Sequence, residues 1–127
     1  MKRFGFALAL LAVTVAFGAR ADSFIPNHQT WSMLSSDSKA GVVAGIADEL
    51  QNPSDEDSPP RKMIGAGLTE CFARLQLKAG ALANAVESWY RADPQRQSAP
   101  AHIAFFGAVP GGLCKSFIET ERKRQNL

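Results

Sequence analysis

The chain has 127 residues and carries 14 Lys and Arg against 12 Asp and Glu, a net charge of +2. This length is that of one domain with a single core of modest size. Two isolated cysteines and two distant histidines do not form the four-ligand spacing of a structural zinc site, so composition argues against a metal centre.

The N-terminus has the three parts of a secretory signal peptide. Lys2 and Arg3 precede an apolar stretch from Phe4 to Phe17, and the small-x-small sequence Ala19-Arg20-Ala21 follows. The apolar stretch is about fourteen residues long, whereas a membrane-spanning helix needs about twenty. We therefore expect residues 1–21 to be cleaved between Ala21 and Asp22 and the protein to be periplasmic, with an uncleaved membrane anchor as the alternative.

Removal of the signal changes the charge of the protein. Lys2, Arg3 and Arg20 leave and no acidic residue does, so residues 22–127 carry 11 basic and 12 acidic groups, a net charge of −1. A near-neutral domain lacks the electrostatic attraction that nucleic acids and anionic membranes require. We expect a single domain, residues 22–127, with neither of these partners.

Both cysteines, Cys71 and Cys114, lie in the part that would be exported. An oxidising compartment favours a disulfide, and two cysteines allow one intramolecular pairing. Closing a loop of about 44 residues would stabilise the fold by roughly 4 kcal/mol in the loop-entropy description. Two free thiols or an intermolecular bridge are the alternatives.

The first part of the mature chain predicts a lead-in and one helix. Residues 22–29 read as an extended lead-in with His28 facing solvent, and Trp31, Met33 and Leu34 as the first residues to contact the core. Ser35 to Asp37 supply capping side chains for a helix over about 36–51. Gly41 and Gly45, four residues apart on this helix, suggest that another helix approaches closely.

Proline and charge patterns divide the remainder. Residues 52–61 form a Pro-rich linker whose acidic run, 55–57, we interpret as a solvated loop. Apolar periodicity predicts helices over about 62–76, 78–92 and 100–109, and a short one in the tail, 116–127. Pro110-Gly111-Gly112 is expected to end the 100–109 helix and return Cys114 toward Cys71. The fold class is all-α: a small bundle of four to five helices closed by one disulfide.

No catalytic, metal or cofactor constellation is apparent. His28 lies in the lead-in and His102 in the helix over about 100–109, where it is a conceivable base without a nucleophile tied to it by motif. A triad assembled in space is the alternative. We expect no enzyme activity and no cofactor.

The pattern from Trp31 to about Phe117 resembles the Tai-type immunity proteins, small exported helical proteins associated with type VI secretion amidase effectors. It begins with Trp31, the helix from Lys39 to Asp48, and Cys71. The helix from Leu82 to Tyr90, ending in Asp93-Pro94, follows. Arg96, the helix from Ala99 to Val109, and Cys114 complete the pattern. The chain departs from the family pattern in two places. The linker at residues 52–61 is longer than expected for the family, and Pro110-Gly111-Gly112 lengthens the segment that leads to Cys114.

The resemblance implies an all-helical periplasmic domain that binds a peptidoglycan amidase toxin and covers or plugs its active site. It also implies homodimers as a possible state, since several members of the family are dimers. A looser likeness to small periplasmic acid-stress chaperones, which share the exported helical plan with one disulfide, gives the alternative function. No residue of an inhibitory loop is carried over.

Overall fold

The computed structural model describes residues 25–127, and the signal peptide expected over residues 1–21, with its Ala21–Asp22 junction, lies outside these residues. Within them the protein is all-α, as predicted from sequence. The α-helices are α1 (His28–Ser32), α2 (Ser36–Gln51), α3 (Pro59–Leu75), α4 (Ala79–Ala92), α5 (Ala101–Ala108) and α6 (Lys115–Arg124). A 3₁₀-helix, η2 (Pro94–Ser98), follows α4, and a π-helical turn, η3 (Val109–Leu113), joins α5 to α6.

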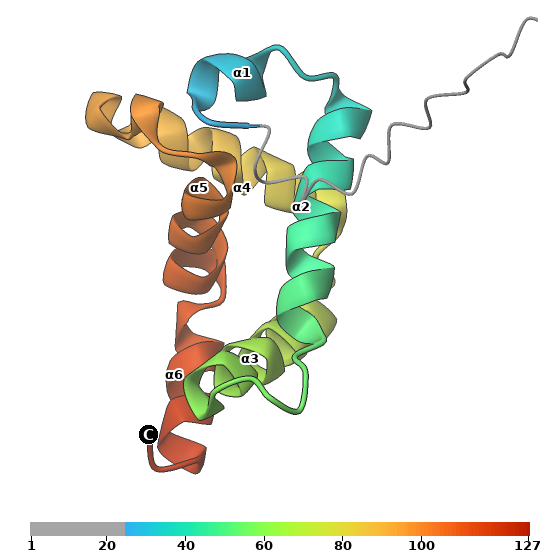
Figure 1. The fold of residues 1–127 in the computed structure, drawn as a ribbon, viewed down its shortest axis with the longest axis vertical. Coiled ribbons are helices and arrows are strands. Elements are labelled where there is room, and N and C mark those ends of the chain that lie inside the picture. Colours follow the sequence, from blue (N-terminus) through green and yellow to red (C-terminus); the bar gives the residue numbers. More distant parts are fainter. Residues whose placement is uncertain (1–24) are drawn as a thin grey trace, which may run out of the picture.

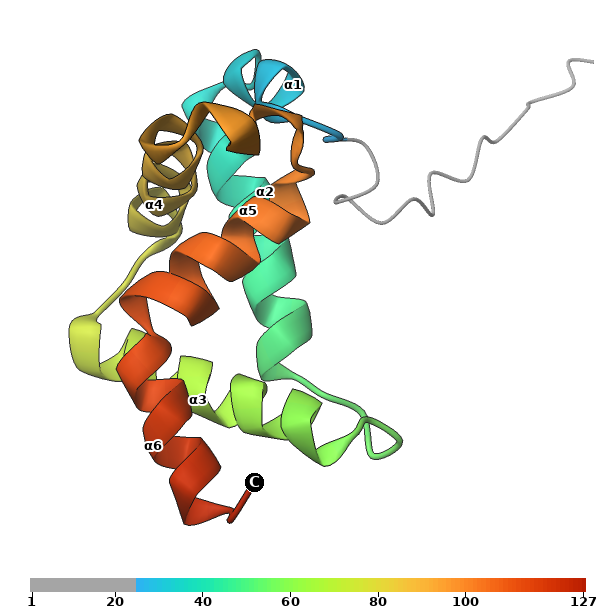
Figure 2. The same ribbon diagram turned by 90° about the vertical axis from the view of Figure 1, so that its left-hand side faces the viewer.

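The helices are arranged around the long axis of the molecule. α2 runs along one side and α5, η3 and α6 along the other (Figure 1). α1 and α4 lie at one end, and α3 crosses α6 at the other end, close to the C-terminus (Figure 2). The most extensive helix pairings are α3 with α6, α4 with α5, and α2 with both α3 and α4.

The largest buried side chains of the core come from α1, α4 and α5. These fully buried side chains are Trp31 from α1, Tyr90 from α4 and Phe105 from α5. Val43 of α2 and Leu68 of α3 extend the same cluster toward the other end. By contrast, α6 contributes no buried residue and packs through side chains that are only partly buried.

Local sequence chemistry accounts for the helix starts. Ser35 caps α2 by accepting a hydrogen bond from the amide of Ser38, as the sequence predicts. Ser58 caps α3 in the same way, and α3 begins at Pro59, three residues earlier than expected. The linker prediction was wrong for residues 59–61, because proline is well suited to the first turn of a helix, where its missing N–H has no partner to lose.

The lead-in differs from the sequence prediction in two respects. Asn27 caps the short helix α1 by accepting from the amide of Thr30, so residues 28 and 29 are helical rather than extended. Trp31 is buried as expected, but Met33 is 80% exposed and does not contact the core. α1 has only five residues, so its position depends on the contacts of its side chains rather than on helix propensity.

The glycines that allow close packing are not those expected. A Cβ at Gly41 or Gly45 would meet nothing within 4 Å, so no helix approaches them. A Cβ at Gly67 would lie 2.9 Å from the Cα of Ile118, where α3 crosses α6. A Cβ at Gly107 would overlap the indole ring of Trp89, where α5 meets α4.

Pro110-Gly111-Gly112 also behaves differently from the prediction. It does not end the helical path but forms η3, in which the amide of Cys114 donates to the carbonyl of Val109, 2.8 Å away. The wider turn accommodates the residue without an N–H and carries the chain directly into α6. Cys114 is therefore placed at the junction between η3 and α6.

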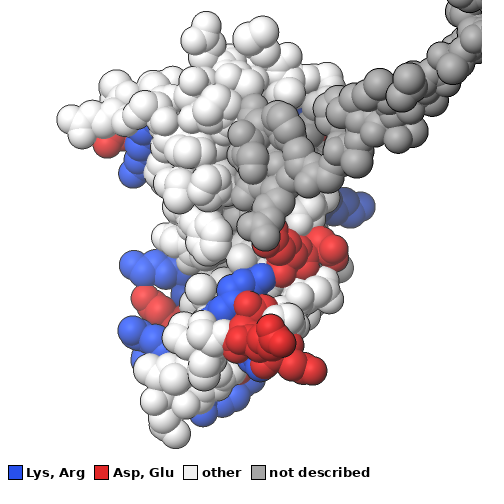
Figure 3. Space-filling view, viewed as in Figure 1, with Lys and Arg blue, Asp and Glu red and all other residues white. Residues whose placement is uncertain are grey.

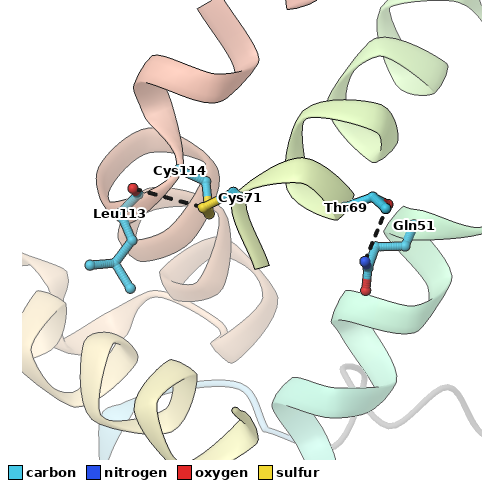
Figure 4. Close-up of a disulfide and its surroundings, with 5 residues drawn as sticks. All are labelled: Gln51, Thr69, Cys71, Leu113 and Cys114. Atoms are coloured by element: carbon cyan, nitrogen blue, oxygen red, sulfur yellow. Dashed lines mark hydrogen bonds between the residues drawn. A yellow bond between two sulfur atoms is a disulfide. The ribbon is translucent and has the colours of Figure 1, made fainter. Parts of the chain in front are cut away.

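One disulfide joins Cys71 of α3 to Cys114, as the fold prediction requires, and both residues are fully buried. Their Cα atoms are 5.5 Å apart. The Cys71 sulfur lies 3.9 Å from the carbonyl oxygen of Leu113, whose side chain points away from the sulfurs (Figure 4). Because a disulfide sulfur carries no hydrogen, this approach is a contact rather than a donated hydrogen bond. On the other side of α3, Gln51 donates to Thr69.

Candidate functional site

A carboxylate at the centre of a polar cluster ties α1 to α4. Glu87 accepts hydrogen bonds from the indole N–H of Trp31 at 2.9 Å and from Arg91 at 2.9 Å, and its Oε1 lies 3.1 Å from Nε2 of His28. The other ring nitrogen of His28 lies 2.5 Å from the side-chain oxygen of Gln97 in η2. Because both ring nitrogens face acceptors, the protonated ring donates two hydrogen bonds and the neutral ring one.

The expectation that His28 faces solvent was wrong. Its side chain is only 18% exposed, and its ring lies 4.7 Å from the ring of Tyr90. Sequence reasoning missed the cluster because Glu87, the residue that organises it, lies far from His28 and Trp31 in the chain. The one sequence signal was Glu87 itself, the sole acidic residue of a helix that is otherwise largely apolar on its buried side.

Two groups of the cluster have shifted pKa values. Burial by itself would raise the pKa of Glu87, but hydrogen bonds from His28, Trp31 and Arg91 outweigh it and lower the pKa below its ordinary value of 4.5. Burial, with a smaller contribution from the charge of Glu87, raises the pKa of Tyr90 to about 12. The Tyr90 hydroxyl therefore stays protonated and donates to the carbonyl of Ala99 at 2.8 Å.

His102, the other histidine, lies in the first turn of α5. Its Nδ1 is buried and has no hydrogen-bond partner, and within residues 25–127 no serine or cysteine side chain bonds to either ring nitrogen. It is not brought together with His28, whose contacts are with Glu87, Gln97 and Tyr90. The structure thus shows no nucleophile paired with His102 in the part of the chain that it describes.

Neither a metal site nor a membrane span is evident among the described residues. Residues 25–127 contain no group of three or more His, Cys, Asp or Glu side chains arranged to hold a metal ion. No single helix among them is long and apolar enough to cross a membrane. The continuous segment of α5 and η3 reaches that length and apolar composition only when α6 is added to it. The axis of α6 is bent by 74° from that segment.

An uncharged surface extends over α5 and η3. From Gln97 to Cys114 the sequence contains no Lys, Arg, Asp or Glu, and three large apolar side chains of this stretch are exposed: Ile103 at 46%, Phe106 at 37% and Leu113 at 43%. We call these three residues the α5–η3 surface. In the space-filling view the end formed by α1, α4 and α5 is mostly uncharged, whereas both signs of charge gather over α3 and α6 (Figure 3).

Two clefts lie elsewhere. One, of about 250 Å³, separates α3 from α6 and contains two arginines, Arg74 and Arg124, each already paired with a glutamate of its own helix. The other, of about 200 Å³, lies between α2 and α4 and reaches Glu87. In the first cleft each arginine is paired with a glutamate of the same helix. In the second cleft Lys39 of α2 and Glu87 of α4 form no ion pair with each other.

Comparison with known proteins gives no relative for this chain: no family model, no curated protein and no solved structure matches it.

Proposed function

We propose that this is an exported protein-binding domain that inhibits a peptidoglycan amidase, as an immunity protein does, and that it is not an enzyme. The observation that carries the proposal is the α5–η3 surface. Exposed Ile103, Phe106 and Leu113 within an uncharged stretch are the kind of residues that form the apolar centre of a protein interface. The resemblance in spacing from Trp31 to Phe117 supplies the class of partner.

The geometry around this surface supports a rigid binding face. α5 packs on α4 through Phe105, which is fully buried, and Gly107 meets the ring of Trp89. The disulfide at Cys114 joins the end of η3 to α3. A face held on both sides loses little conformational freedom on binding, which favours affinity.

The test is inhibition of a purified amidase effector of the type VI class by the mature protein, expected to begin at Asp22. Pull-down from envelope and secreted fractions, followed by mass identification, selects the amidase to purify. We expect inhibition of peptidoglycan cleavage at equimolar protein. Ile103→Glu places a charge in the apolar surface and should weaken inhibition by at least about tenfold, a typical loss at the centre of an interface.

Met33→Glu is the matched control, because Met33 is also an exposed apolar residue but lies outside the α5–η3 surface. It should leave inhibition unchanged, and both variants should keep the helical circular dichroism of the parent protein. If no amidase is captured or inhibited, the proposed function is wrong. If both variants inhibit equally well, the assignment of the surface is wrong.

A second candidate is a periplasmic acid chaperone, and one observation favours it. Trp31 is anchored to α4 through Glu87, and protonation of that carboxylate in acid would weaken the attachment of α1 and expose apolar surface. The test is protection of a client protein from aggregation near pH 2–3. The helicity of the protein without client is measured at the same pH for comparison. Retained helicity without protection would eliminate this candidate.

A further inference from the structure

The cleft between α2 and α4 has a lining that differs from the rest of the surface. Ser36 and Lys39 line it from α2, and four residues line it from α4: Gly80, Ala83, Asn84 and Glu87. The α4 residues recur at intervals of three and four, so they occupy one face of that helix. A hydroxyl, an ammonium, an amide and a carboxylate thus converge on a space of about 200 Å³.

The two charges in this cleft do not neutralise each other. Lys39 and Glu87 form no ion pair together, and Lys39 has no ion pair at all with residues 25–127. Both charges are instead arranged about Trp31: the Lys39 ammonium is 5.6 Å from the centre of the indole ring, and the indole N–H donates to Glu87. The Lys39 ammonium and the Glu87 carboxylate, which is also paired with Arg91, therefore line the same cleft.

The sequence keeps this cleft open. A Cβ at Gly80 would meet nothing within 4 Å, so the absence of a side chain there is not required by packing. Ala83 is the smallest side chain that a helix can carry without the propensity cost of glycine. Gly80 is the second residue of α4, and a larger side chain at Gly80 or Ala83 would project into the cleft that both residues line.

We propose that the α2–α4 cleft binds a small zwitterionic α-amino acid. Its carboxylate would pair with Lys39, assisted by the hydroxyl of Ser36, and its ammonium would pair with Glu87, assisted by the side-chain carbonyl of Asn84. Glu87 is held in place for this role because His28, Trp31 and Arg91 orient it. No covalent step is involved, and the cleft lies on helices other than those of the α5–η3 surface.

The size of the cleft limits the ligand. A water molecule occupies about 30 Å³ in the liquid, so a cleft of about 200 Å³ has the volume of about six waters. This matches a molecule of about six non-hydrogen atoms, such as alanine. Binding of so small and well hydrated a molecule to a cleft open to solvent should be weak, with a Kd on the order of 1 mM.

The test is a titration of the ¹⁵N-labelled mature protein with D-alanine and, separately, L-alanine, followed by NMR. We expect saturable shifts of amides in residues 36–39 and 80–87 and of the Trp31 indole N–H. Acetate and methylamine, which each carry only one of the two charges, should bind at least about tenfold more weakly, because each can pair with only one of the two charged side chains of the cleft. Preference for D- or L-alanine would distinguish a cell-wall source from a general amino-acid source.

Two variants separate ligand binding from folding. Lys39→Met removes the ammonium, and Gly80→Leu fills the cleft; each should raise the Kd for alanine at least tenfold while the spectrum outside the cleft is retained. Lys115→Met, which makes the same change of charge on α6, should bind alanine normally. Absence of saturable shifts, equal binding of acetate, or equal weakening by Lys115→Met would overturn the proposal without affecting the α5–η3 surface.

Discussion

The two ends of this molecule are held together by different means. Where α1, α4 and α5 meet, Trp31, Tyr90 and Phe105 are fully buried and supply a large apolar area. Where α3 meets α6, no residue of α6 is buried, and the contact depends on the disulfide and on the close approach of Gly67 to Ile118. We refer to these as the aromatic end and the disulfide end.

The difference shows how a small domain divides its stability. A fully buried aromatic side chain contributes several kcal/mol through the area that it removes from water. A helix as rich in charge as α6, with Lys115 at its start and Arg122, Lys123 and Arg124 in its last turn, has little apolar area to bury. The disulfide at Cys114, the residue just before α6, replaces part of that missing burial.

The largest expected effect is loss of the aromatic end. Trp31→Ala should lower the free energy of unfolding by about 3–5 kcal/mol, because it removes a fully buried side chain and leaves a cavity. It also leaves Glu87 without the indole N–H. Urea denaturation measures the change, and Met33→Ala, at an 80% exposed position, is the control with an effect within about 0.5 kcal/mol. A loss below 1 kcal/mol would contradict the packing of α1.

Removal of the disulfide is expected to affect the other end. Replacing Cys71 and Cys114 together by serine should cost roughly 4 kcal/mol and lower the Tm by well over ten degrees in a domain of about 100 residues. Hydrogen exchange should accelerate more in α6 than in α4, because α6 has no buried residue to hold it. A Tm change of one or two degrees would show that the bond contributes little to this end.

A smaller effect should follow from closing the α3–α6 approach. Gly67→Ala places a Cβ 2.8 Å from a side-chain carbon of Ile118 and 2.9 Å from its Cα, so the backbones must separate, at a cost of about 1–3 kcal/mol. Gly45→Ala, in α2, meets nothing within 4 Å and should stabilise the protein by up to about 1 kcal/mol through helix propensity. Thermal denaturation of the pair is the measurement; equal shifts would contradict the crossing geometry.

The smallest effect is the pH dependence of the aromatic end. Burial opposes ionisation of Glu87, but its hydrogen bonds prevail and its folded pKa lies below the ordinary 4.5. Its contribution to stability is therefore complete above the unfolded pKa and is lost as the pH falls through the lowered folded value. Urea midpoints of the parent protein should fall more steeply below pH 4.5 than those of Glu87→Gln. Parallel curves would show that this carboxylate does not stabilise the fold.

Periodicity and capping chemistry were sufficient to predict α2, α4 and α5, because these helices are rich in apolar residues and have clear boundaries. The cap at Ser35 and the break before Pro94 depend on residues next to each other in the chain. α1 was missed although Asn27 supplies a local cap, because five residues are too few to show an apolar period, and η3 was missed because proline and glycine usually end a helix. α1 is held by Glu87 in α4, and Pro110 is accommodated by a turn that continues into α6.

The proposed binding surface was less predictable than the fold. An apolar residue such as Phe105 or Phe106 has the same periodicity whether it faces the core or solvent, and only packing against α4 distinguishes them. The glycines show the same limit, since Gly45 and Gly67 are alike in sequence, and only the second has a helix against it. The α2–α4 cleft likewise combines residues from two helices between which α3 lies in the chain, so the sequence does not show that they are neighbours.

The position of the disulfide sets an order of assembly. α4 and α5 are near neighbours in the chain, so their aromatic contacts close short loops, whereas Cys71 and Cys114 are separated by 43 positions. A chain whose cysteines are reduced would close the short loop between α4 and α5 and leave α6 without its covalent link to α3. Oxidation of the two thiols then fastens this last helix to the rest of the molecule.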